Sequence, residues 1–521
     1  MVADGCSAGL ELQEEDTKAL ETALTGGAML CIPIKGPTYP DAIKQIEQAL
    51  TWSHLVELRL DQFSEFDLDK LQSLLSHFSE AHFVFTLRSS SQGGGFSGSE
   101  EDRLEKIEAL AALQPHYLDL EYNVPVSFFE KIHHSFPSIK IIASYHDFLR
   151  IGDLEAIVQQ LCQLPTSYYK IATLADSSSE VLSSMLTMKN APKLGMIMNM
   201  GQVGSLSRIL APIYGSPFVY ASLDSTLATA PGQLSAQELV KVYHHQDLNA
   251  QTAVFGLIGT EVGISPSHLS HNALLSHFHL NGVYVKFPVY QGQLKGFLDK
   301  ARQLGIRGLS VTMPWKEEVL KYLDEITPEA KSIGAVNTLF LDQGKLKGYN
   351  TDGIGALNAL EKRAKITDQK VVIIGAGGSA RAIAFEAKRR GADVLIINRT
   401  DEKAFKLAQE LDCQGGGLEQ MTAAFQTGYD VLINTTPHQL PIDPSLIIPY
   451  STVMDILLQP THTLLIQEAL KKECQIVYGW EMFFNQAIAQ FEIWFGGQIP
   501  IDQLREGLKA EVLKALQVEK A

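Results

Sequence analysis

The chain has 521 residues, more than one ordinary domain, so two or three domains are expected. Its composition, 45% hydrophobic and 20% charged, is typical of a soluble globular protein. The net charge of −16 argues against nucleic acid or an anionic membrane as a partner, and no apolar run reaches membrane-spanning length. An anionic substrate would therefore need a local cluster of basic side chains.

The cysteines and the N-terminal residues indicate the cellular compartment. The cysteine count is odd and no CxxC spacing occurs, which is typical of reduced cytosolic thiols and predicts no metal site. The cysteines are Cys6, Cys31, Cys162, Cys413 and Cys474. Residues 1–24 are acidic and lack the features of a targeting signal, so we expect a short N-terminal tail and a cytoplasmic protein. The oligomeric state stays open between monomer and homodimer.

Eight short apolar, β-rich runs lie between residues 29 and 223, with helix-like stretches such as 101–113 between them. Such alternation predicts a parallel sheet, and eight units in about 220 residues predict a closed (β/α)₈ TIM barrel. The runs are MLCIPI, LVELRL, HFVFTLR, YLDLEY, KIIASYHD, YYKIATLA, KLGMIMNM and FVYASL.

Lys170 lies inside the sixth of these runs. A lysine near the end of a buried strand is desolvated, which favours the neutral amine that attacks a ketone to form a Schiff base. Other polar residues interrupt the runs near their C-terminal ends, where barrel enzymes carry their chemistry. These residues are Glu57, Arg59, Arg88 and His146, and Arg208 follows the seventh run. Each alone has a structural interpretation, but six on one rim predict an active site.

Charge suggests a role for each of these side chains. Lys170 would form the imine, and His146 on the neighbouring strand would move protons near neutral pH. Glu57 would orient either His146 or Lys170. Because arginine forks suit carboxylates, we expect the three arginines to hold a small anionic hydroxy-ketone. The segment 230–233, APGQ, is expected to form a loop that closes over it.

The motifs VELRLD, TLRS, SYHDF, YYKIA, GxxSR and APGQ resemble type I 3-dehydroquinate dehydratase in order and spacing across residues 28–245. That family dehydrates 3-dehydroquinate to 3-dehydroshikimate with a Schiff-base lysine and a histidine acid/base. The resemblance places these roles on Lys170 and His146. It places substrate contacts on Glu57, Arg59, Arg88, Arg208, Thr229 and Gln233. Thr229 stands where a serine is common and keeps the hydroxyl group.

The second half contains a dinucleotide-binding pattern. A polar stretch at 241–253 predicts the connection between the halves, and the sequence from Lys370 reads strand, glycine turn, helix, strand. Gly375, Gly377 and Ala380 form GxGxxA, which permits a tight turn and close approach of a pyrophosphate to the helix N-terminus. In this context the pattern predicts a dinucleotide site.

The end of the second strand of this pattern predicts which dinucleotide binds. An acidic residue there would hold the ribose hydroxyls of NAD, whereas Arg399 and Lys403 suit a 2′-phosphate and favour NADPH. The alternative is that Arg399 is only a solvated surface residue. The predicted cofactor contacts are Gly375, Ala376, Gly377, Gly378, Ser379, Ala380, Asn398, Arg399, Thr400 and Lys403.

The motifs SPSHLSHN, LSVTMPWKE, GAVNTL, GYNTDG and FFNQA resemble shikimate dehydrogenase across residues 254–515. The resemblance implies that Lys316 and Asp352 form the catalytic couple, which supplies a proton while NADPH supplies a hydride to the ketone. Besides Asp352, it places substrate contacts on Ser265, Ser267, Thr312, Asn337 and Gln486.

Two positions depart from the dehydrogenase pattern. Leu458 precedes Gln459-Pro460 where Tyr-Asn-Pro is usual, so the tyrosine contact of the family is absent. Gln439 stands where glycine is usual, and we expect it to crowd the nicotinamide or to change its loop. Both departures bear on substrate affinity and on the choice between shikimate and quinate.

The two halves fit consecutive reactions, because the product of the first is the substrate of the second. The chain thus resembles the bifunctional dehydratase–dehydrogenases of aromatic amino-acid and chorismate biosynthesis. The expected α/β organisation has five parts: tail 1–24, barrel 25–247, substrate-binding domain 252–355, Rossmann NADP-binding domain 356–490, and a C-terminal helix at 491–521 that returns to the substrate domain.

Three alternatives remain. A quinate dehydrogenase would prefer NAD and change the serine contacts, against which Ser265, Ser267 and Arg399 argue. A quinate-pathway transcriptional regulator derived from these enzymes should have lost its catalytic residues, which are all present here. A barrel aldolase would account for Lys170 but not for the arginines or the second half.

Overall fold

The computed structural model describes residues 27–224 and 233–516. The chain divides into two compact units, residues 1–252 and 253–521. Thr229 and the predicted tail 1–24 lie outside the described residues.

All eight predicted runs of the first unit form strands, and each strand from β1 to β7 pairs in parallel with the next. β8 pairs with β1, so the order is β7-β6-β5-β4-β3-β2-β1-β8. Among the described residues the ladder is interrupted only between β7 and β8, so the predicted barrel is confirmed as nearly closed. The strands are β1 (Met29–Ile34), β2 (Leu55–Arg59), β3 (His82–Thr86), β4 (Tyr117–Glu121), β5 (Lys140–Asp147), β6 (Tyr168–Leu174), β7 (Gly195–Met200) and β8 (Phe218–Tyr220).

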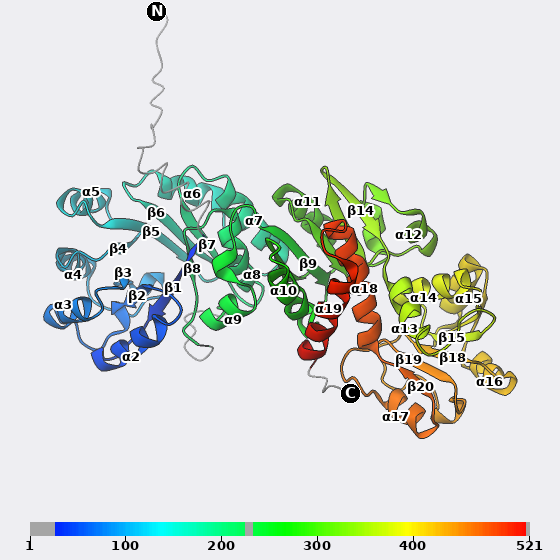
Figure 1. Cartoon of the computed structure of the whole chain (residues 1–521). Coiled ribbons are helices and arrows are strands. Elements are labelled where there is room, and N and C mark those ends of the chain that lie inside the picture. Colours follow the sequence, from blue (N-terminus) through cyan, green and yellow to red (C-terminus); the bar gives the residue numbers. More distant parts are fainter. Residues whose placement is uncertain (1–26, 225–232, 517–521) are drawn as a thin grey trace, which may run out of the picture. The chain divides into compact units, whose positions relative to one another are not determined.

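Helices surround these strands (Figure 1). They are α2 (Tyr39–Ala49), α3 (Leu68–His77), α4 (Glu100–Ala112), α5 (Val126–Ser135), α6 (Leu154–Cys162), α7 (Ser178–Lys189), α8 (Ser205–Leu210) and α9 (Ala236–Lys241). Local sequence sets their ends: the Ser177 side chain accepts from the N–H of Glu180, whose carboxylate accepts from the N–H of Ser177. On α2, Ala42, Ile46 and Ala49 are buried, as expected for one face of a helix.

The barrel interior changes from apolar to polar along the strands. Residues two positions apart on a strand point to the same side, so an interior position is followed by another two residues later. Leu55, Tyr117 and Tyr168 belong to an apolar cluster. Two residues further along the same strands stand Glu57, Asp119 and Lys170, all buried. The two-residue period of the strands therefore places these charged side chains together in the barrel interior. They lie next to the apolar cluster, toward the C-terminal ends of the strands.

The second unit begins with a lobe built on a mixed sheet of order β10-β9-β11-β13-β14-β12, which we call the first lobe. Its strands are β9 (Ala253–Gly259), β10 (Gly282–Pro288), β11 (Gly308–Val311), β12 (Glu325–Ile326), β13 (Thr338–Asp342) and β14 (Lys345–Tyr349). Its helices are α10 (Ser267–His277), α11 (Leu294–Leu304) and α12 (Pro328–Ile333). The pairing of β13 with β11 and β14 is antiparallel.

The Rossmann lobe has a parallel sheet of order β17-β16-β15-β18-β19-β20. Its order changes direction between β15 and β18, and ligands of such sheets bind at this switch point. The strands are β15 (Lys370–Ile374), β16 (Asp393–Ile397), β17 (Gln414–Gly416), β18 (Val431–Asn434), β19 (Thr452–Asp455) and β20 (Gln475–Val477). The helices are α14 (Gly378–Arg389), α15 (Asp401–Leu411), α16 (Leu418–Thr427) and α17 (Leu464–Lys471).

Two further helices connect the two lobes, and a third packs on the first lobe. Helices α13 (Asp352–Leu360) and α18 (Gly479–Phe495) pack together; α13 also packs on α14, and α18 contacts β13. Helix α19 (Ile501–Ala515) packs on α10 of the first lobe. The expected domain border at residue 490 falls inside α18. The predicted two-lobed α/β unit with a Rossmann lobe is confirmed.

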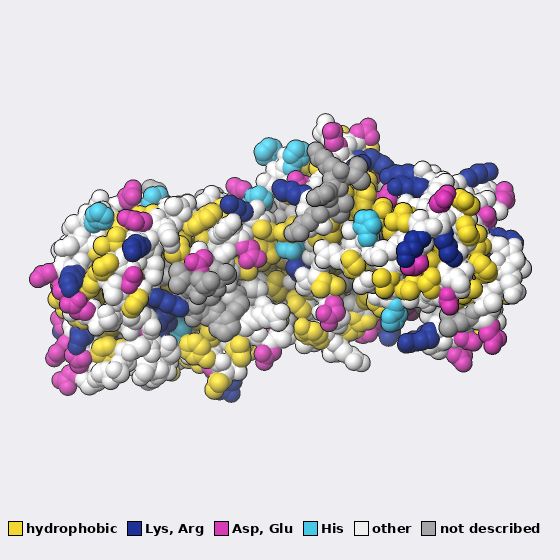
Figure 2. Space-filling view, turned by 90° about the horizontal axis from the view of Figure 1, so that it is seen from below, with side chains coloured by type: hydrophobic (Ala, Val, Ile, Leu, Met, Phe, Trp, Pro, Cys, Tyr) yellow, Lys and Arg dark blue, Asp and Glu magenta, His cyan; other side chains and the backbone are white. Residues whose placement is uncertain are grey.

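The visible surface carries charges of both signs. Figure 2 shows acidic and basic side chains interspersed among apolar and neutral ones on one face. In the described part of the chain, no helix has both the length and the apolar character needed to span a membrane.

Candidate functional site

Lys170 is the centre of the polar cluster in the barrel. Its side chain is 4% exposed, and its Nζ lies 3.0 Å from Glu57 Oε1 and 3.0 Å from Asp119 Oδ2. The same Nζ lies 4.1 Å from the centroid of the Tyr220 ring. A buried ammonium would be costly alone, but here two carboxylates and an aromatic face compensate its charge.

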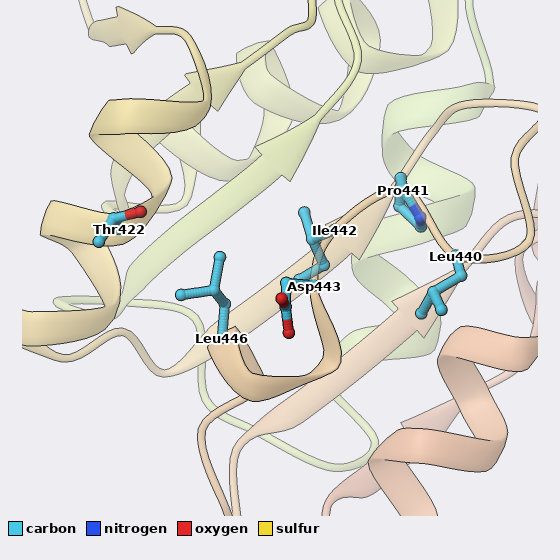
Figure 3. Close-up of a pocket in the computed structure, with 6 residues that line it drawn as sticks. All are labelled: Thr422, Leu440, Pro441, Ile442, Asp443 and Leu446. Atoms are coloured by element: carbon cyan, nitrogen blue, oxygen red, sulfur yellow. The ribbon is translucent and has the colours of Figure 1, made fainter.

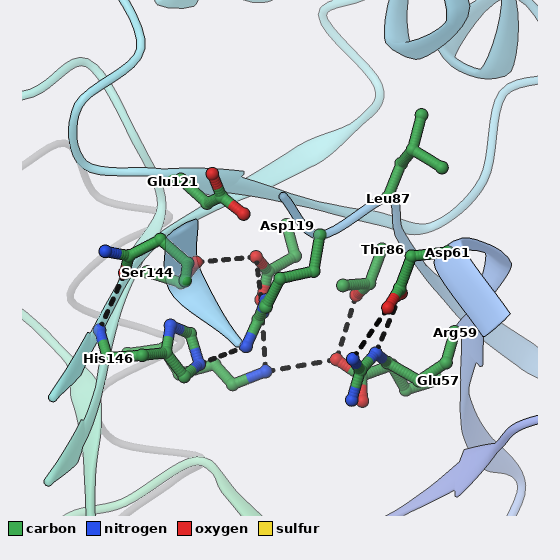
Figure 4. A network of polar contacts seen from close by, with 12 residues as sticks. Glu57, Arg59, Asp61, Thr86, Leu87, Asp119, Glu121, Ser144 and His146 are labelled. Atoms are coloured by element: carbon green, nitrogen blue, oxygen red, sulfur yellow. Dashed lines mark hydrogen bonds and ion pairs between the residues drawn. The ribbon is translucent and has the colours of Figure 1, made fainter. Parts of the chain in front are cut away.

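Asp119 was not among the predicted site residues. It accepts a 2.6 Å hydrogen bond from Ser144 Oγ (Figure 4). It also forms a 2.9 Å ion pair with Arg88 Nη2, in addition to its contact with Lys170. Burial opposes its ionisation, yet the charges of Arg88 and Lys170 hold the pKa of this carboxyl well below its usual range. A carboxylate two residues after the interior Tyr117 on the same strand is the signal that would have identified it.

His146 lies at the same end of the barrel on β5. Its backbone N–H donates to Gln92 Oε1 at 3.0 Å, and its Nε2 contacts Arg88 Nη1. Burial, followed by the charges of Arg88 and Lys170, lowers the pKa of His146 well below its usual value of 6.5. The imidazole is therefore neutral at neutral pH and available to accept a proton.

Glu57 and Arg59 have different neighbours. Glu57 accepts from Thr86 Oγ1 at 2.8 Å and contacts Lys170, so of the two expected partners the structure places it beside the lysine. Arg59 forms a forked pair with Asp61, at 2.9 and 2.8 Å. The N–H of Gly95 also donates to Asp61, which ties the loop after β3 to this arginine.

Arg208 is buried, and its Nη1 donates to the carbonyl oxygen of Asn199 at 2.8 Å. Burial lowers the pKa of Arg208 to about 10. Gln233 is described and directly follows the segment 225–232, which contains Thr229 and is not described.

In the second unit, Lys316 and Asp352 form the predicted couple, with 2.5 Å between Nζ and Oδ2. Lys316 follows β11, and Asp352 is the first residue of α13, where the helix dipole favours a carboxylate. Asn337 Nδ2 donates to Asp352 Oδ1 at 2.8 Å. The amide of Asn337 therefore orients the carboxylate that holds the lysine.

The other predicted substrate contacts fall into two groups. Gln486 Oε1 lies 3.4 Å from Asn337 Nδ2, so it belongs to the group of the catalytic couple. Ser265 Oγ donates to Ser267 Oγ at 3.0 Å, at the start of α10. Thr312 stands between β11 and Lys316, and its N–H donates to the carbonyl oxygen of Ile258 at 2.9 Å.

A buried chain of hydrogen bonds that the motifs did not reveal leads into this group. Tyr284 OH donates to Ser310 Oγ at 2.9 Å, and Ser310 Oγ donates to Gln490 Oε1 at 3.0 Å. Gln490 Nε2 donates to Thr338 Oγ1 at 2.9 Å, and Thr338 Oγ1 donates to Asn337 Oδ1 at 2.8 Å. Polar side chains inside otherwise apolar elements were the only sequence signal for it.

The glycine-rich loop joins β15 to α14 at the switch point of the Rossmann sheet. Gly375 has a φ of +115°, and a Cβ there would lie 2.3 Å from Thr435 Oγ1. Gly377 is the N-cap of α14, and a Cβ there would meet no heavy atom within 4 Å. The backbone thus turns tightly and leaves open space at a helix N-terminus, which fits a pyrophosphate.

The end of β16 carries the residues expected to select the cofactor. Arg399 and Lys403 are exposed, and within 27–224 and 233–516 neither forms a salt bridge. Asn398 Nδ2 donates to the carbonyl oxygen of Thr400 at 3.0 Å, which shapes this turn. Two exposed cations beside the turn fit a 2′-phosphate.

The two departures lie on the Rossmann lobe and beside it. Gln439 is exposed, and its carbonyl oxygen accepts from the N–H of Leu465 at 2.8 Å. Leu458 packs against an apolar cluster that includes Phe484. A cavity of about 320 Å³ opens next to this loop, and Thr422, Leu440, Pro441, Ile442, Asp443 and Leu446 line it (Figure 3). None of these lining residues is a predicted site residue.

Family models match both halves of the chain. The model described as type I 3-dehydroquinase matches residues 30–250. The shikimate dehydrogenase substrate binding domain matches 257–339, shikimate/quinate 5-dehydrogenase matches 358–457, and the shikimate 5′-dehydrogenase C-terminal domain matches 479–509.

The chain is 35% identical over 476 residues to the shikimate biosynthesis protein AroDE of Chlamydia pneumoniae, covering 90% of this chain and 95% of the relative. It belongs to the family of bifunctional 3-dehydroquinate dehydratase/shikimate dehydrogenases. The chloroplastic bifunctional 3-dehydroquinate dehydratase/shikimate dehydrogenase of Arabidopsis thaliana is 32% identical over 504 residues, 91% of this chain and 83% of that protein.

The second half also matches shikimate dehydrogenases over their full length. The shikimate dehydrogenase (NADP(+)) of Methanocaldococcus jannaschii is 40% identical over 286 residues, which cover 51% of this chain and all of that relative. Membership of the bifunctional family confirms the resemblance drawn from the motifs of both halves.

Proposed function

We propose that the chain converts 3-dehydroquinate to 3-dehydroshikimate in its barrel and reduces that product to shikimate with NADPH in its second unit. The observation that carries this proposal is that each unit holds its own lysine paired with a carboxylate, the buried Lys170 with Asp119 and the partly buried Lys316 with Asp352. The family supports both activities, and the name of the archaeal relative supports NADP as the cofactor.

In the barrel, the Lys170 ammonium gives a proton to the neutral His146, and the resulting amine adds to the substrate ketone. His146 returns that proton to the former ketone oxygen, which leaves as water and gives a protonated imine. The imine acidifies the adjacent carbon, whose proton the neutral His146 accepts. His146 then gives the proton to the departing hydroxyl group, which leaves as water, and hydrolysis of the imine restores Lys170. Asp119 and Glu57, at 3.0 Å, balance the positive charge on the lysine nitrogen throughout.

In the second unit, the loop from Gly375 to Ala380 would hold NADPH, which when bound would supply hydride chemistry for reduction of the ketone. Lys316 then gives a proton to the oxygen that becomes the new hydroxyl. Asp352, fixed by Asn337, keeps the lysine oriented during this transfer. Together, Ser265, Ser267, Thr312 and Gln486 would hold the substrate carboxylate and ring hydroxyls.

Arg399 and Lys403 would hold the 2′-phosphate, and the loop from Gly375 to Ala380 would hold the pyrophosphate. We retain the expectation of a monomeric or homodimeric cytoplasmic enzyme as part of this proposal.

One mixture tests both activities. The protein is incubated with 3-dehydroquinate and NADPH, and NADPH oxidation is followed together with shikimate formation. Shikimate that forms only when both reagents are present supports the proposal. Accumulation of 3-dehydroshikimate without NADPH oxidation would reject the dehydrogenase half and direct attention to Leu458 and Gln439. No reaction would favour a regulatory protein.

A further inference from the structure

The catalytic lysine of the second unit contacts the glycine-rich loop directly. Lys316 Nζ donates to Ser379 Oγ at 2.9 Å, and Ser379 Oγ lies 3.4 Å from Asp352 Oδ2. Lys316 and Asp352 precede the Rossmann sheet in the chain, whereas Ser379 is the second residue of α14. A single hydroxyl of the expected dinucleotide site therefore touches both members of the catalytic couple.

The backbone around this contact is closely packed. A Cβ added at Gly378 would lie 3.0 Å from the Cβ of Lys316. A Cβ added at Gly353, beside Asp352, would lie 2.5 Å from the carbonyl oxygen of Ala382 on α14. The N-terminal parts of α13 and α14 therefore have little room to move independently. A shift of the glycine-rich loop should displace Lys316 and Asp352 as well.

The charges around this contact indicate how a bound dinucleotide would affect Lys316. The N-terminus of α14 has a partial positive charge, so an ammonium beside it is unfavourable unless anions lie near. Asp352 is one such anion, and the pyrophosphate of a dinucleotide at the same helix end would be a second. Occupation of the loop should therefore favour the position that Lys316 holds in the structure.

We propose that Ser379 is a positioning residue that couples the dinucleotide site to the proton-donating Lys316, so that the dinucleotide and shikimate bind cooperatively. An ammonium has three N–H donors. Asp352 and Ser379 accept two of them, which leaves the third for the substrate hydroxyl. This inference rests on the proposed dehydrogenase function and adds to it a coupling through one side chain.

Binding of NADPH in the absence and presence of shikimate tests this coupling, because both compounds are reduced and cannot react with each other. NADPH dissociation constants are measured by fluorescence titration. For the wild-type protein we expect saturating shikimate to tighten NADPH binding by about fivefold or more, the usual range for coupled sites. In Ser379→Ala the hydroxyl that joins the two sites is lost, so this factor should fall below about twofold, under the range of typical coupling. Ser379→Thr keeps a hydroxyl and should retain the wild-type factor.

Two further measurements separate coupling from a structural role in the loop. If Ser379 acts through Lys316, then Lys316→Ala removes the coupling, and adding Ser379→Ala changes nothing more. In turnover with saturating 3-dehydroshikimate, Ser379→Ala should lower kcat and raise the KM for NADPH by about the coupling factor that it loses, whereas Ser379→Thr should keep both values near wild type.

The inference is overturned if wild-type binding shows no coupling, or if Ser379→Ala weakens NADPH equally with and without shikimate. The inference is also overturned if Ser379→Ala lowers the coupling factor as much in the Lys316→Ala protein as in the wild-type protein. The rate of the wild-type protein with NADPH and 3-dehydroshikimate is measured first. Absence of that rate would reject the proposed function itself, whereas a normal rate with unchanged coupling in Ser379→Ala would reject only this inference.

Discussion

Lys170 Nζ on β6 lies 3.0 Å from Asp119 Oδ2 on β4, across the intervening strand β5. The other oxygen of Asp119 accepts from Arg88, which also contacts His146. One carboxylate therefore connects the nucleophile, through an arginine, to the acid/base. Its removal should disturb both functions of the barrel at once.

Asp119→Asn tests this connection while preserving the shape of the side chain. Removing one preorganised electrostatic partner of a reacting group typically lowers kcat by about 100- to 1,000-fold, so we expect the dehydratase kcat to fall by at least about 100-fold. Borohydride trapping of the imine, read by mass spectrometry, should be reduced in parallel. The dehydrogenase rate of the same sample is the internal control. A dehydratase rate within twofold of wild type would show that Lys170 does not need this carboxylate.

The two active sites should be separable by single substitutions. Lys170→Ala removes the only amine proposed to form the imine, so dehydration should be lost while reduction of added 3-dehydroshikimate continues. Lys316→Ala should have the opposite effect. Each variant is assayed with both substrates, and each serves as the folding control of the other. Loss of both activities from either change would contradict independent sites.

Arg399 should set the preference for NADPH. A hydrogen bond to a charged group contributes about 1.5–3 kcal/mol, so Arg399→Asp should weaken NADPH binding by about 10- to 100-fold. NADH binding should change much less, because NADH lacks the 2′-phosphate. Lys365→Ala removes another exposed cation of the same unit and is the matched control. Equal losses for NADPH and NADH would mean that Arg399 does not contact the phosphate.

Buried histidines should make the protein sensitive to acid. Burial lowers the pKa of His271 to about 3 and that of His245 to about 4. The unfolded chain therefore binds more protons than the folded one below about pH 6.5, and stability falls as the pH drops through this window. Each such histidine contributes about 1.4 kcal/mol per pH unit.

The variant His271→Phe tests the contribution of one histidine. His271 packs among Tyr284, Phe491 and Trp494, so phenylalanine suits its surroundings. Melting temperatures are measured from pH 7 to pH 4 for both proteins. We expect the variant to lose less stability per pH unit, whatever its stability at pH 7. Parallel curves would show that His271 does not charge on unfolding.

Local sequence was sufficient to predict the helices and strands and the kind of chemistry at both sites. Strand and helix periods extend over a few residues, so the eight barrel strands and the turn from Gly375 to Ala380 were predictable from the residues that form them. The Lys170 and Lys316 motifs were also predictable, because each lies within one continuous segment. The nearly closed barrel and the Rossmann lobe follow from these same patterns.

The partners of the catalytic groups depended on the tertiary structure. Glu57 contacts Lys170, 113 residues away, and Ser379 contacts Lys316, 63 residues away. Asp119 joins the barrel site only because strand order and register place β4 and β6 on either side of β5. A period in the sequence determines which side of a strand a residue occupies, but the assembly of strands and lobes decides which charge it meets there.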